Sequence, residues 1–347
     1  MVPTNELIEN LKEQNELWDI FTRKEEYNPL FLDKYERFPY HLSNYRKIFS
    51  PLVSRYLLEN GFKPEYPDGK KFAVCLTHDI DITNEGYLRC AVNSVKSTFR
   101  GNLSDAVKYP IYAINKKKHP YWNFHEIMKL EEKYGAKSSF YFLALEPREV
   151  DYTYDLQSIR DDIRLIDAKG WEVGLHGGHE SYKNLEDIVT KKRMIESILG
   201  KEVVGYRNHY LRFKVPDTWE LLSKAGFKYD TTFGYADCVG FRNGMCHPFK
   251  PFNLNTGKQI DILEIPLVIM DNTLLKDYMR LDFEKAWELT KQLIDCVKQC
   301  RGVITVLWHN NSMQGEKLQF YEKLLKYCQG EEAWMTSGNE IERLFNV

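Results

Sequence analysis

Seven short apolar runs between residues 72 and 308 constrain the fold of this chain more than any other feature. Most of them are separated by segments with helical spacing, in which residues such as Phe283, Trp287 and Ile294 fall on one helical face. Strands that alternate with helices build a parallel sheet, either open or closed into a barrel, so the sequence predicts an α/β fold. The predicted strands are FAVCL (72–76), SSFYFLAL (138–145), WEVGL (171–175), VVGY (203–206), FKY (227–229), IDILEIPL (260–267) and GVITVLW (302–308).

Composition and charge exclude several classes of partner. Of the 347 residues, 43% are hydrophobic, which is enough to bury a large core. The net charge of −2 gives no reason to expect nucleic acid as a partner, and Lys-Lys-Lys at 116–118 is expected to be solvated surface. No apolar run approaches the about 18 residues of a membrane span. The first residues are polar and acidic and do not resemble a secretory signal. The seven cysteines are scattered along the chain, which predicts reduced thiols. We therefore expect a cytoplasmic protein with no membrane span.

The chain divides by pattern into two parts. Residues 1–70 predict short helices with aromatic-rich connections, and residues 71–347 contain all seven predicted strands. We expect the first part to be a helical extension that packs on the outside of the barrel, with a glycan- or partner-binding module as the alternative. The long connections 84–121 and 231–258 are expected to carry lids or binding loops. The aromatic residues that favour packing of the extension are Phe38, Tyr40, Tyr45 and Phe49.

Ionisable side chains follow five of the seven predicted strands. Because the carboxyl ends of parallel strands meet at one mouth of an α/β barrel, we expect these side chains to converge on one site. They are His78, Asp79 and Asp81 after the first strand, His176, His179 and Glu180 after the third, Arg207, Asn208 and His209 after the fourth, Asp230 after the fifth, and His309 after the seventh.

This set of side chains predicts a metal site. Carboxylate and imidazole groups from separate strands are the ligands of a divalent transition metal, zinc first, with cobalt and nickel as alternatives. Such a metal acidifies a bound water and polarises a carbonyl group, which is the chemistry of hydrolysis. A second carboxylate is then available as general base and a more distant imidazole as general acid.

Five segments in this region resemble, in order, the five motifs of the polysaccharide deacetylase (NodB homology, CE4) family, whose fold is an irregular (β/α)7 barrel. The resemblance therefore implies that barrel, with the N-terminal helical extension added to it. Residues 205–213 and 263–271 are similar to a bacterial branch of polysaccharide-deacetylase-like proteins. The five segments are THDID (77–81), LHGGHES (175–181), YRNHY (206–210), YDTT (229–232) and VLWH (306–309).

The resemblance implies that Asp81 and His176 bind the metal, but it leaves the third ligand open. Glu180 stands where the family has its second histidine, and His179 lies one residue too early. His209 replaces the proline of the third motif. We favour His209 as the third ligand because it follows a different strand from His176, and His179 is the alternative.

The resemblance and the strand positions also assign roles in catalysis. They imply a metal-dependent hydrolase that removes N-acetyl, or alternatively O-acetyl, groups from a sugar or surface polysaccharide. The alternatives are a hydrolase of a non-sugar amide and a catalytically inactive glycan-binding or scaffold protein. The assigned roles are Asp79 as general base, Arg207 as its ion-pair partner, His309 as general acid, Asp230 beside His309 to raise its pKa, the backbone N–H of Tyr210 as oxyanion donor, and Leu307 as an apolar seat for the acetyl methyl group.

Overall fold

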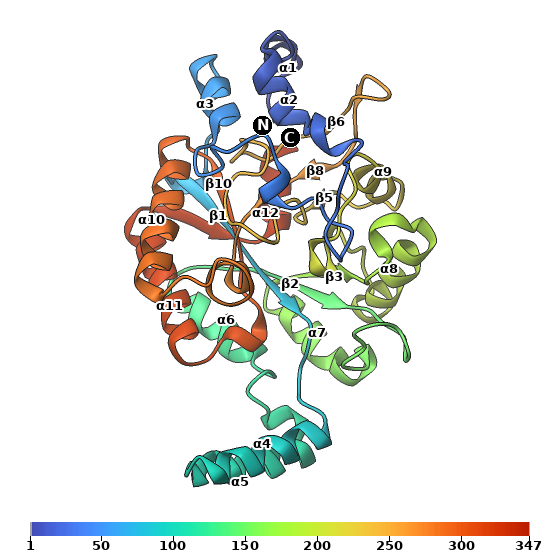
Figure 1. The fold of residues 1–347 in the computed structure, drawn as a ribbon, viewed down its shortest axis with the longest axis vertical. Helices are drawn as coiled ribbons and strands as arrows, with labels where there is room; N and C mark the ends of the chain where they lie inside the picture. Colours follow the sequence, from blue (N-terminus) through green and yellow to red (C-terminus); the bar gives the residue numbers. More distant parts are fainter. Residues whose placement is uncertain (1, 347) are drawn as a thin grey trace.

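The computed structural model describes residues 2–346, with all of their side chains except that of Asp105. Nine strands form one curled parallel sheet with helices around it (Figure 1). Along the sheet the order is β8-β5-β4-β3-β2-β1-β10-β9, and β11 also pairs with β1. The strands are β1 (Phe72–Ile80), β2 (Ser139–Leu143), β3 (Glu172–Gly177), β4 (Gly205–Asn208), β5 (Tyr229–Asp230), β8 (Leu263–Glu264), β9 (Leu267–Met270), β10 (Val303–Leu307) and β11 (Ala333–Thr336).

The two ends of the sheet are joined by the chain itself. Strands β8 and β9 lie at opposite ends of the strand order, yet only residues 265–266 separate them in sequence. The short connection therefore curls the sheet into a barrel, although β8 and β9 do not pair with each other.

Helices cover the outside of the sheet. No helix within residues 2–346 combines the length and apolar character needed to cross a bilayer. The helices around the sheet are α6 (Phe124–Lys133), α7 (Arg160–Ala168), α8 (Leu185–Leu199), α9 (Asp217–Lys224), α10 (Phe283–Gln299), α11 (Gly315–Gly330) and α12 (Gly338–Phe345).

The predicted α/β barrel is confirmed as the fold class, but the strands differ from the prediction in their bounds and in their number. Strand β1 continues to Ile80 because residues 77–80 pair with residues 139–142 of β2. The predicted strand at 260–267 is divided into β8 and β9. Strand β11 was not predicted, since its four residues are too few to show a period of two.

The N-terminal residues form a helical layer against the barrel, with α1 (Asn5–Lys12), α2 (Asn15–Thr22) and α3 (Leu52–Glu59). Buried apolar residues of all three helices belong to the same hydrophobic core as the barrel strands. A buried ion-pair cluster also joins the two parts, because Glu26 accepts a hydrogen bond of 2.7 Å from Arg23 Nε and one of 3.0 Å from Arg242 Nε. Breaking a buried pair of this kind leaves an uncompensated charge and costs about 3–5 kcal/mol.

This packing corrects the expectation that residues 231–258 form a lid or binding loop. Residues 230–249 are almost all buried, and they lie under the extension. The backbone N–H of Val53 donates to the carbonyl of Gly244, and that of Phe241 donates to the carbonyl of Ile48. The segment ends in a small antiparallel pair, β6 (Phe252–Asn253) and β7 (Lys258–Gln259).

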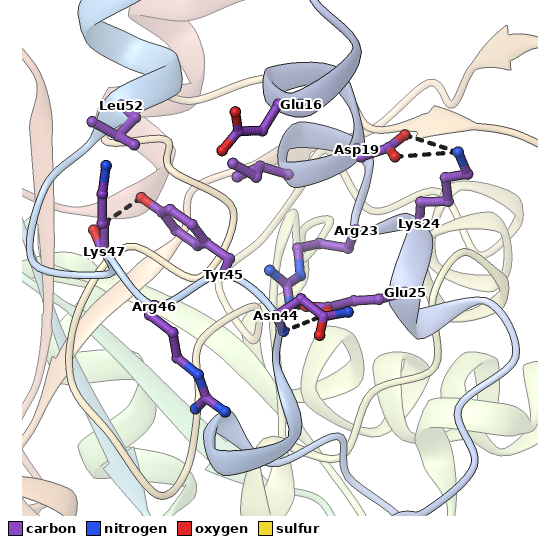
Figure 2. Close-up of a pocket in the computed structure, with 11 residues that line it drawn as sticks. Glu16, Asp19, Arg23, Lys24, Glu25, Asn44, Tyr45, Arg46, Lys47 and Leu52 are labelled. Atoms are coloured by element: carbon purple, nitrogen blue, oxygen red, sulfur yellow. Dashed lines mark hydrogen bonds and ion pairs between the residues drawn. The ribbon is translucent and has the colours of Figure 1, made fainter.

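A cavity of about 560 Å³ lies within the extension (Figure 2). Its charged side chains pair locally, since Lys24 contacts Asp19 at 3.1 Å and Glu25 accepts a hydrogen bond of 2.7 Å from the backbone of Asn44. The hydroxyl of Tyr45 donates to the carbonyl of Lys47 at 3.0 Å. None of the strand-end residues lines this cavity, so it is separate from the predicted site.

A buried histidine links the extension to the barrel. His247 Nε2 donates to the carbonyl of Cys300 at 2.9 Å, so its Nδ1 is left to accept from the hydroxyl of Ser54 on α3, also at 2.9 Å. The bond from Ser54 requires the neutral ring, because a protonated Nδ1 has no lone pair with which to accept. Burial lowers the pKa of His247 to about 4.

We expect His247 to make the protein sensitive to acid. The unfolded chain protonates this ring at about pH 6.5 and the folded protein only near pH 4, so stability is complete above pH 6.5 and falls as the pH decreases toward 4. In urea unfolding, the wild type should lose about 2 kcal/mol more than His247→Gln between pH 7 and pH 5. His41→Gln, at an exposed position, should behave as the wild type. Parallel losses in wild type and His247→Gln would contradict this assignment.

Candidate active site

A pocket of about 420 Å³ opens at the carboxyl ends of the strands. It brings together residues from β1, β3, β9, β10, the segment after β4 and the N-terminal extension. Five of the strand-end residues predicted from the sequence reach it, namely Asp79, Asp81, His176, His209 and His309. The remaining lining residues are Lys34, Tyr35, Arg37, Tyr210, Leu211, Met270, Asn272, Asp277 and Tyr278.

Alternation along β1 decides which of its polar residues face this pocket. Asp79 lies in the strand and Asp81 just after it, so the two carboxylates point to the same side of the sheet. His78 points to the other side, where its Nδ1 lies 2.6 Å from the carbonyl of Trp308 and its Nε2 lies 2.9 Å from Glu131 Oε1. His78 therefore belongs to a buried structural network and not to the site.

Asp81, His176 and His209 form a set that could hold a metal ion. One potential ligand atom from each lies within 4.8 Å of the other two. His176 Nε2 is 3.2 Å from Asp81 Oδ1, and His209 Nδ1 is 3.1 Å from His176 Nε2. The three residues come from three different strand ends, β1, β3 and β4, as the sequence predicted.

Outer contacts orient the two imidazoles. His176 Nδ1 donates to the carbonyl of Arg207 at 3.0 Å, which leaves the lone pair of Nε2 facing Asp81. His209 Nε2 lies 3.3 Å from Asp151 Oδ2, so Nδ1 is the nitrogen that faces the other two residues. An acceptor behind the ring, such as the one that holds His176, is common for metal-binding histidines, whereas His209 Nε2 makes no hydrogen bond within the described residues. Asp151 was not predicted, because it lies in the irregular segment after β2 and outside every motif.

The residues present fit a divalent cation. Asp81 Oδ1 and Asp79 Oδ1 are both buried and have no hydrogen-bond partner within the described residues. Burial alone would raise the pKa of Asp81, but His176, His209 and His309 hold that pKa well below its usual range. An ionised, unpartnered carboxylate oxygen beside two imidazole nitrogens is a donor set suited to zinc and related metals.

His309 is paired with Asp271 and not with Asp230, which corrects the sequence prediction. His309 Nδ1 lies 2.6 Å from Asp271 Oδ1, and its Nε2 lies 3.6 Å from Asp81 Oδ2. Burial lowers the pKa of His309, but the neighbouring carboxylates, Asp271 first, raise it to about 9. Asp271 directly follows β9, so the rule of strand ends would have found it if the sixth strand had been placed correctly.

Asp230 lies deeper, beneath the pocket. It is paired in register with Glu264 of β8, and its Oδ1 accepts from the hydroxyl of Thr232 at 2.6 Å. Burial raises the pKa of Asp230 to about 6 and raises that of Glu264 well above its usual range. Glu264 in turn accepts a hydrogen bond of 2.7 Å from Trp219 Nε1. This carboxyl pair is therefore part of the support below the site.

The predicted ion pair between Arg207 and Asp79 is not formed within the described residues. Arg207 donates instead to the hydroxyls of Thr231 and Thr77, each at 2.9 Å. Its Nη1 is buried without a hydrogen-bond partner, as is Asp79 Oδ1. The two threonines hold the guanidinium through Nε and Nη2 instead.

The second candidate for the third ligand, His179, lies outside the metal set. Its Nδ1 is 2.8 Å from Glu180 Oε1, and Arg212 contacts both residues. Glu180 is more than half exposed and also pairs with Lys183. Of the candidates left open by the sequence, His209 is the one whose nitrogen approaches Asp81 and His176.

Tyr210 lines the pocket, whereas Leu307 does not reach it and so does not form the predicted seat for the acetyl methyl group. The backbone of Tyr210 is left-handed, with φ at 58°, and its ring lies 4.1 Å from that of His209 between centroids. Leu307 is buried in a small apolar cluster, from which Leu211 and Met270 reach the pocket. Leu307 therefore packs behind the apolar wall, and its neighbours provide the surface.

The N-terminal extension supplies one wall of the pocket, which the sequence did not predict. The ring of Tyr35 stacks on that of Tyr210 with centroids 4.5 Å apart and 13° between the planes. Arg37 Nη1 donates to the carbonyl of Tyr210 at 2.7 Å, and its Nη2 donates to the hydroxyl of Tyr278 at 2.6 Å. The extension thus fixes the turn that carries His209 and lines the entrance with aromatic rings.

Comparison with solved structures confirms the resemblance in fold to polysaccharide deacetylases. A protein from Mycobacterium smegmatis, provisionally assigned as a polysaccharide deacetylase, is similar over 82% of this chain and 94% of its own, with 17% identity and a TM-score of 0.55. The catalytic domain of a peptidoglycan N-acetylglucosamine deacetylase from Eubacterium rectale matches over 80% of this chain and 93% of its own, with 10% identity and a TM-score of 0.39. BA3943 of Bacillus anthracis, a CE4 family pseudoenzyme, matches over 82% of this chain and 70% of its own, with 12% identity and a TM-score of 0.41. No protein-family model and no curated protein sequence matches the chain. The first similarity shows a shared fold.

The metal set is tested by separating the two histidine candidates. Protein loaded with zinc and dialysed should retain the metal in the wild type and in His179→Ala. His209→Ala should lose more than about 100-fold in affinity, since loss of an outer-shell contact alone costs about 10- to 100-fold. Metal content by mass spectrometry and competition with a chelating dye measure both effects. Retention of zinc by His209→Ala together with its loss from His179→Ala would transfer the ligand role to His179.

Proposed function

We propose that the protein is a metal-dependent hydrolase that removes N-acetyl groups from a sugar or glycan. Removal of O-acetyl groups is the second candidate reaction. The observation that carries the proposal is the convergence of Asp81, His176 and His209 beside Asp79 and His309, in one pocket of a fold shared with a polysaccharide deacetylase. We further propose that it acts in the cytoplasm, which its seven free cysteines support.

In this proposal Asp81, His176 and His209 would hold a divalent ion, for which zinc is the first candidate. As a Lewis acid, the ion would polarise the acetyl carbonyl and acidify water. Asp79 is the general base. Its Oδ2 lies 3.6 Å from His176 Nε2, so a free carboxylate stands directly beside the metal set. Asp79 accepts a proton as water attacks the acetyl carbon, and the backbone N–H of Tyr210 is proposed to support the oxyanion.

His309 is the general acid. Its Nε2 faces the pocket while Asp271 holds Nδ1, so the imidazolium is both favoured and aimed. As the carbon–nitrogen bond breaks, His309 gives its proton to the leaving amine, and acetate is the second product. Asp271 acts through His309, so we assign it as a positioning residue.

The aromatic wall supports a sugar as the substrate. Tyr35, Tyr210 and Tyr278 present rings at the entrance, and Arg37 holds this wall rigid through its contacts with the backbone of Tyr210 and the hydroxyl of Tyr278. Rings fixed in this way offer large amphipathic contact surfaces at a small cost in conformational entropy. A sugar ring presents apolar C–H faces to such surfaces, whereas an acyclic amide substrate does not.

Acetate release from an N-acetylhexosamine oligomer tests the proposal. Asp79→Asn should keep zinc but lose about 10²- to 10⁴-fold in kcat, the usual effect of removing a general base.

Asp271→Asn should move the alkaline limb of the pH–rate profile to lower pH, because the imidazolium of His309 loses its 2.6 Å carboxylate partner. Asp230→Asn should leave that limb in place. Zinc binding without acetate release from any acetylated sugar would favour a glycan-binding protein.

The aromatic wall is tested by Tyr35→Ala. Loss of the stacked ring should raise KM for the oligomer by about 2- to 10-fold with kcat nearly unchanged, because the contact is the same in ground and transition states. Tyr35→Phe keeps the ring and should behave as the wild type. An unchanged KM in Tyr35→Ala would remove the wall from substrate binding.

A further inference from the structure

A helical hairpin extends from the barrel at the carboxyl end of β1. It consists of α4 (Tyr87–Phe99) and α5 (Leu103–Ile114), and it begins six residues after Asp81. The two helices pack on each other, with the hydroxyl of Ser94 donating to the carbonyl of Ala106 at 2.7 Å. Figure 1 shows the hairpin at the end of the molecule opposite to α1–α3. No part of the proposed chemistry uses it.

The hairpin exposes much of the apolar side-chain surface of the protein. Nine of the seventeen large apolar residues that are exposed in the described chain lie in these two helices. Leu88, Phe99 and Ile114 are 86%, 88% and 84% exposed. In each helix, four exposed apolar residues follow one another at intervals of three or four positions, so they form a continuous apolar face. The residues that form these faces are Leu88, Val92, Val95 and Phe99 in α4, and Leu103, Val107, Ile111 and Ile114 in α5.

Basic residues flank these apolar faces. Residues 85–119 contain seven lysines and arginines but only two acidic residues, whereas the whole chain carries a net charge of −2. Arg89, Lys96 and Arg100 are exposed on and after α4, and the exposed run of residues 116–118, Lys-Lys-Lys, follows directly after α5. The hairpin is thus strongly positive on a protein that is otherwise negative.

We propose that the α4–α5 hairpin docks on the surface of a lipid bilayer that contains anionic lipids. Apolar helical faces bordered by lysine and arginine are suited to the boundary between headgroups and acyl chains, and each basic residue near an anionic surface adds to the attraction. The charge disfavours a second copy of the chain as the partner, since two hairpins of the same sign would repel each other. Docking would attach the protein through the same strand end that carries Asp79 and Asp81. The proposal does not depend on the deacetylase function.

Co-sedimentation of the full chain with lipid vesicles tests this proposal. The protein should bind vesicles of phosphatidylcholine mixed with phosphatidylglycerol, bind pure phosphatidylcholine vesicles much less, and be released by high salt. Leu88→Ser/Phe99→Ser should abolish binding, and Lys116→Glu/Lys118→Glu should weaken it at least about tenfold. Leu30→Ser/Phe31→Ser is the matched control, because these side chains are 93% and 70% exposed outside the hairpin, and it should bind as the wild type.

Several outcomes would overturn the proposal. Equal binding to neutral and anionic vesicles would remove the role of the basic residues, and unchanged binding by the Leu88→Ser/Phe99→Ser variant would remove the hairpin. No vesicle binding, with a dimer in light scattering that this variant dissociates, would assign the apolar faces to a second copy. No vesicle binding by a monomer would exclude a lipid surface and favour an acidic protein partner. Acetate release from a soluble oligomer should be unchanged in all three variants, so either proposal can fail without the other.

Discussion

The site depends on the register of β1. This strand is buried at all nine positions and is hydrogen-bonded along both edges, to β10 on one side and to β11 and then β2 on the other. A shift of one residue would turn Asp79 away from the pocket and bring His78 into it. The partners of His78 oppose such a shift, since both of its ring nitrogens lie within 2.9 Å of acceptors on the outer side. A buried structural histidine therefore helps to hold a proposed catalytic carboxylate in place.

The N-terminal extension completes this arrangement from a distance in sequence. Arg37 bonds to the backbone of Tyr210, which is 173 residues away, at the turn directly after His209. Two consecutive residues of that turn, Tyr210 and Leu211, have left-handed backbones, with φ at 58° and 55°. Non-glycine residues adopt this conformation at a cost, so surrounding contacts must maintain it. The extension therefore both shapes the pocket entrance and supports a proposed metal ligand.

The sequence predicted those parts of the site that follow from strand ends. Asp79, Asp81, His176, His209 and His309 reach one pocket because parallel strands deliver their carboxyl ends to one edge. The same rule failed for Asp271, because the run 260–267 was treated as one strand although Pro266 lies between the end of β8 and the start of β9. The contacts that individual residues of the extension make with the pocket could not be predicted. Periodicity gives the face of an element but not the partner that covers it, so the wall formed by Tyr35 and Arg37 became visible only in three dimensions.

The pocket holds three histidines, and the group behind each ring is different. Behind His176 stands the backbone carbonyl of Arg207, a neutral acceptor 3.0 Å from Nδ1. Behind His309 stands Asp271, a fully buried carboxylate, which favours the imidazolium. His209 faces Asp151, whose side chain is 35% exposed, whereas that of Asp271 is fully buried. A general acid must carry a proton, and of these three histidines His309 is the one with a fully buried carboxylate behind its ring. The motifs thus give the candidate histidines, and the groups behind their rings support the separate roles proposed for them.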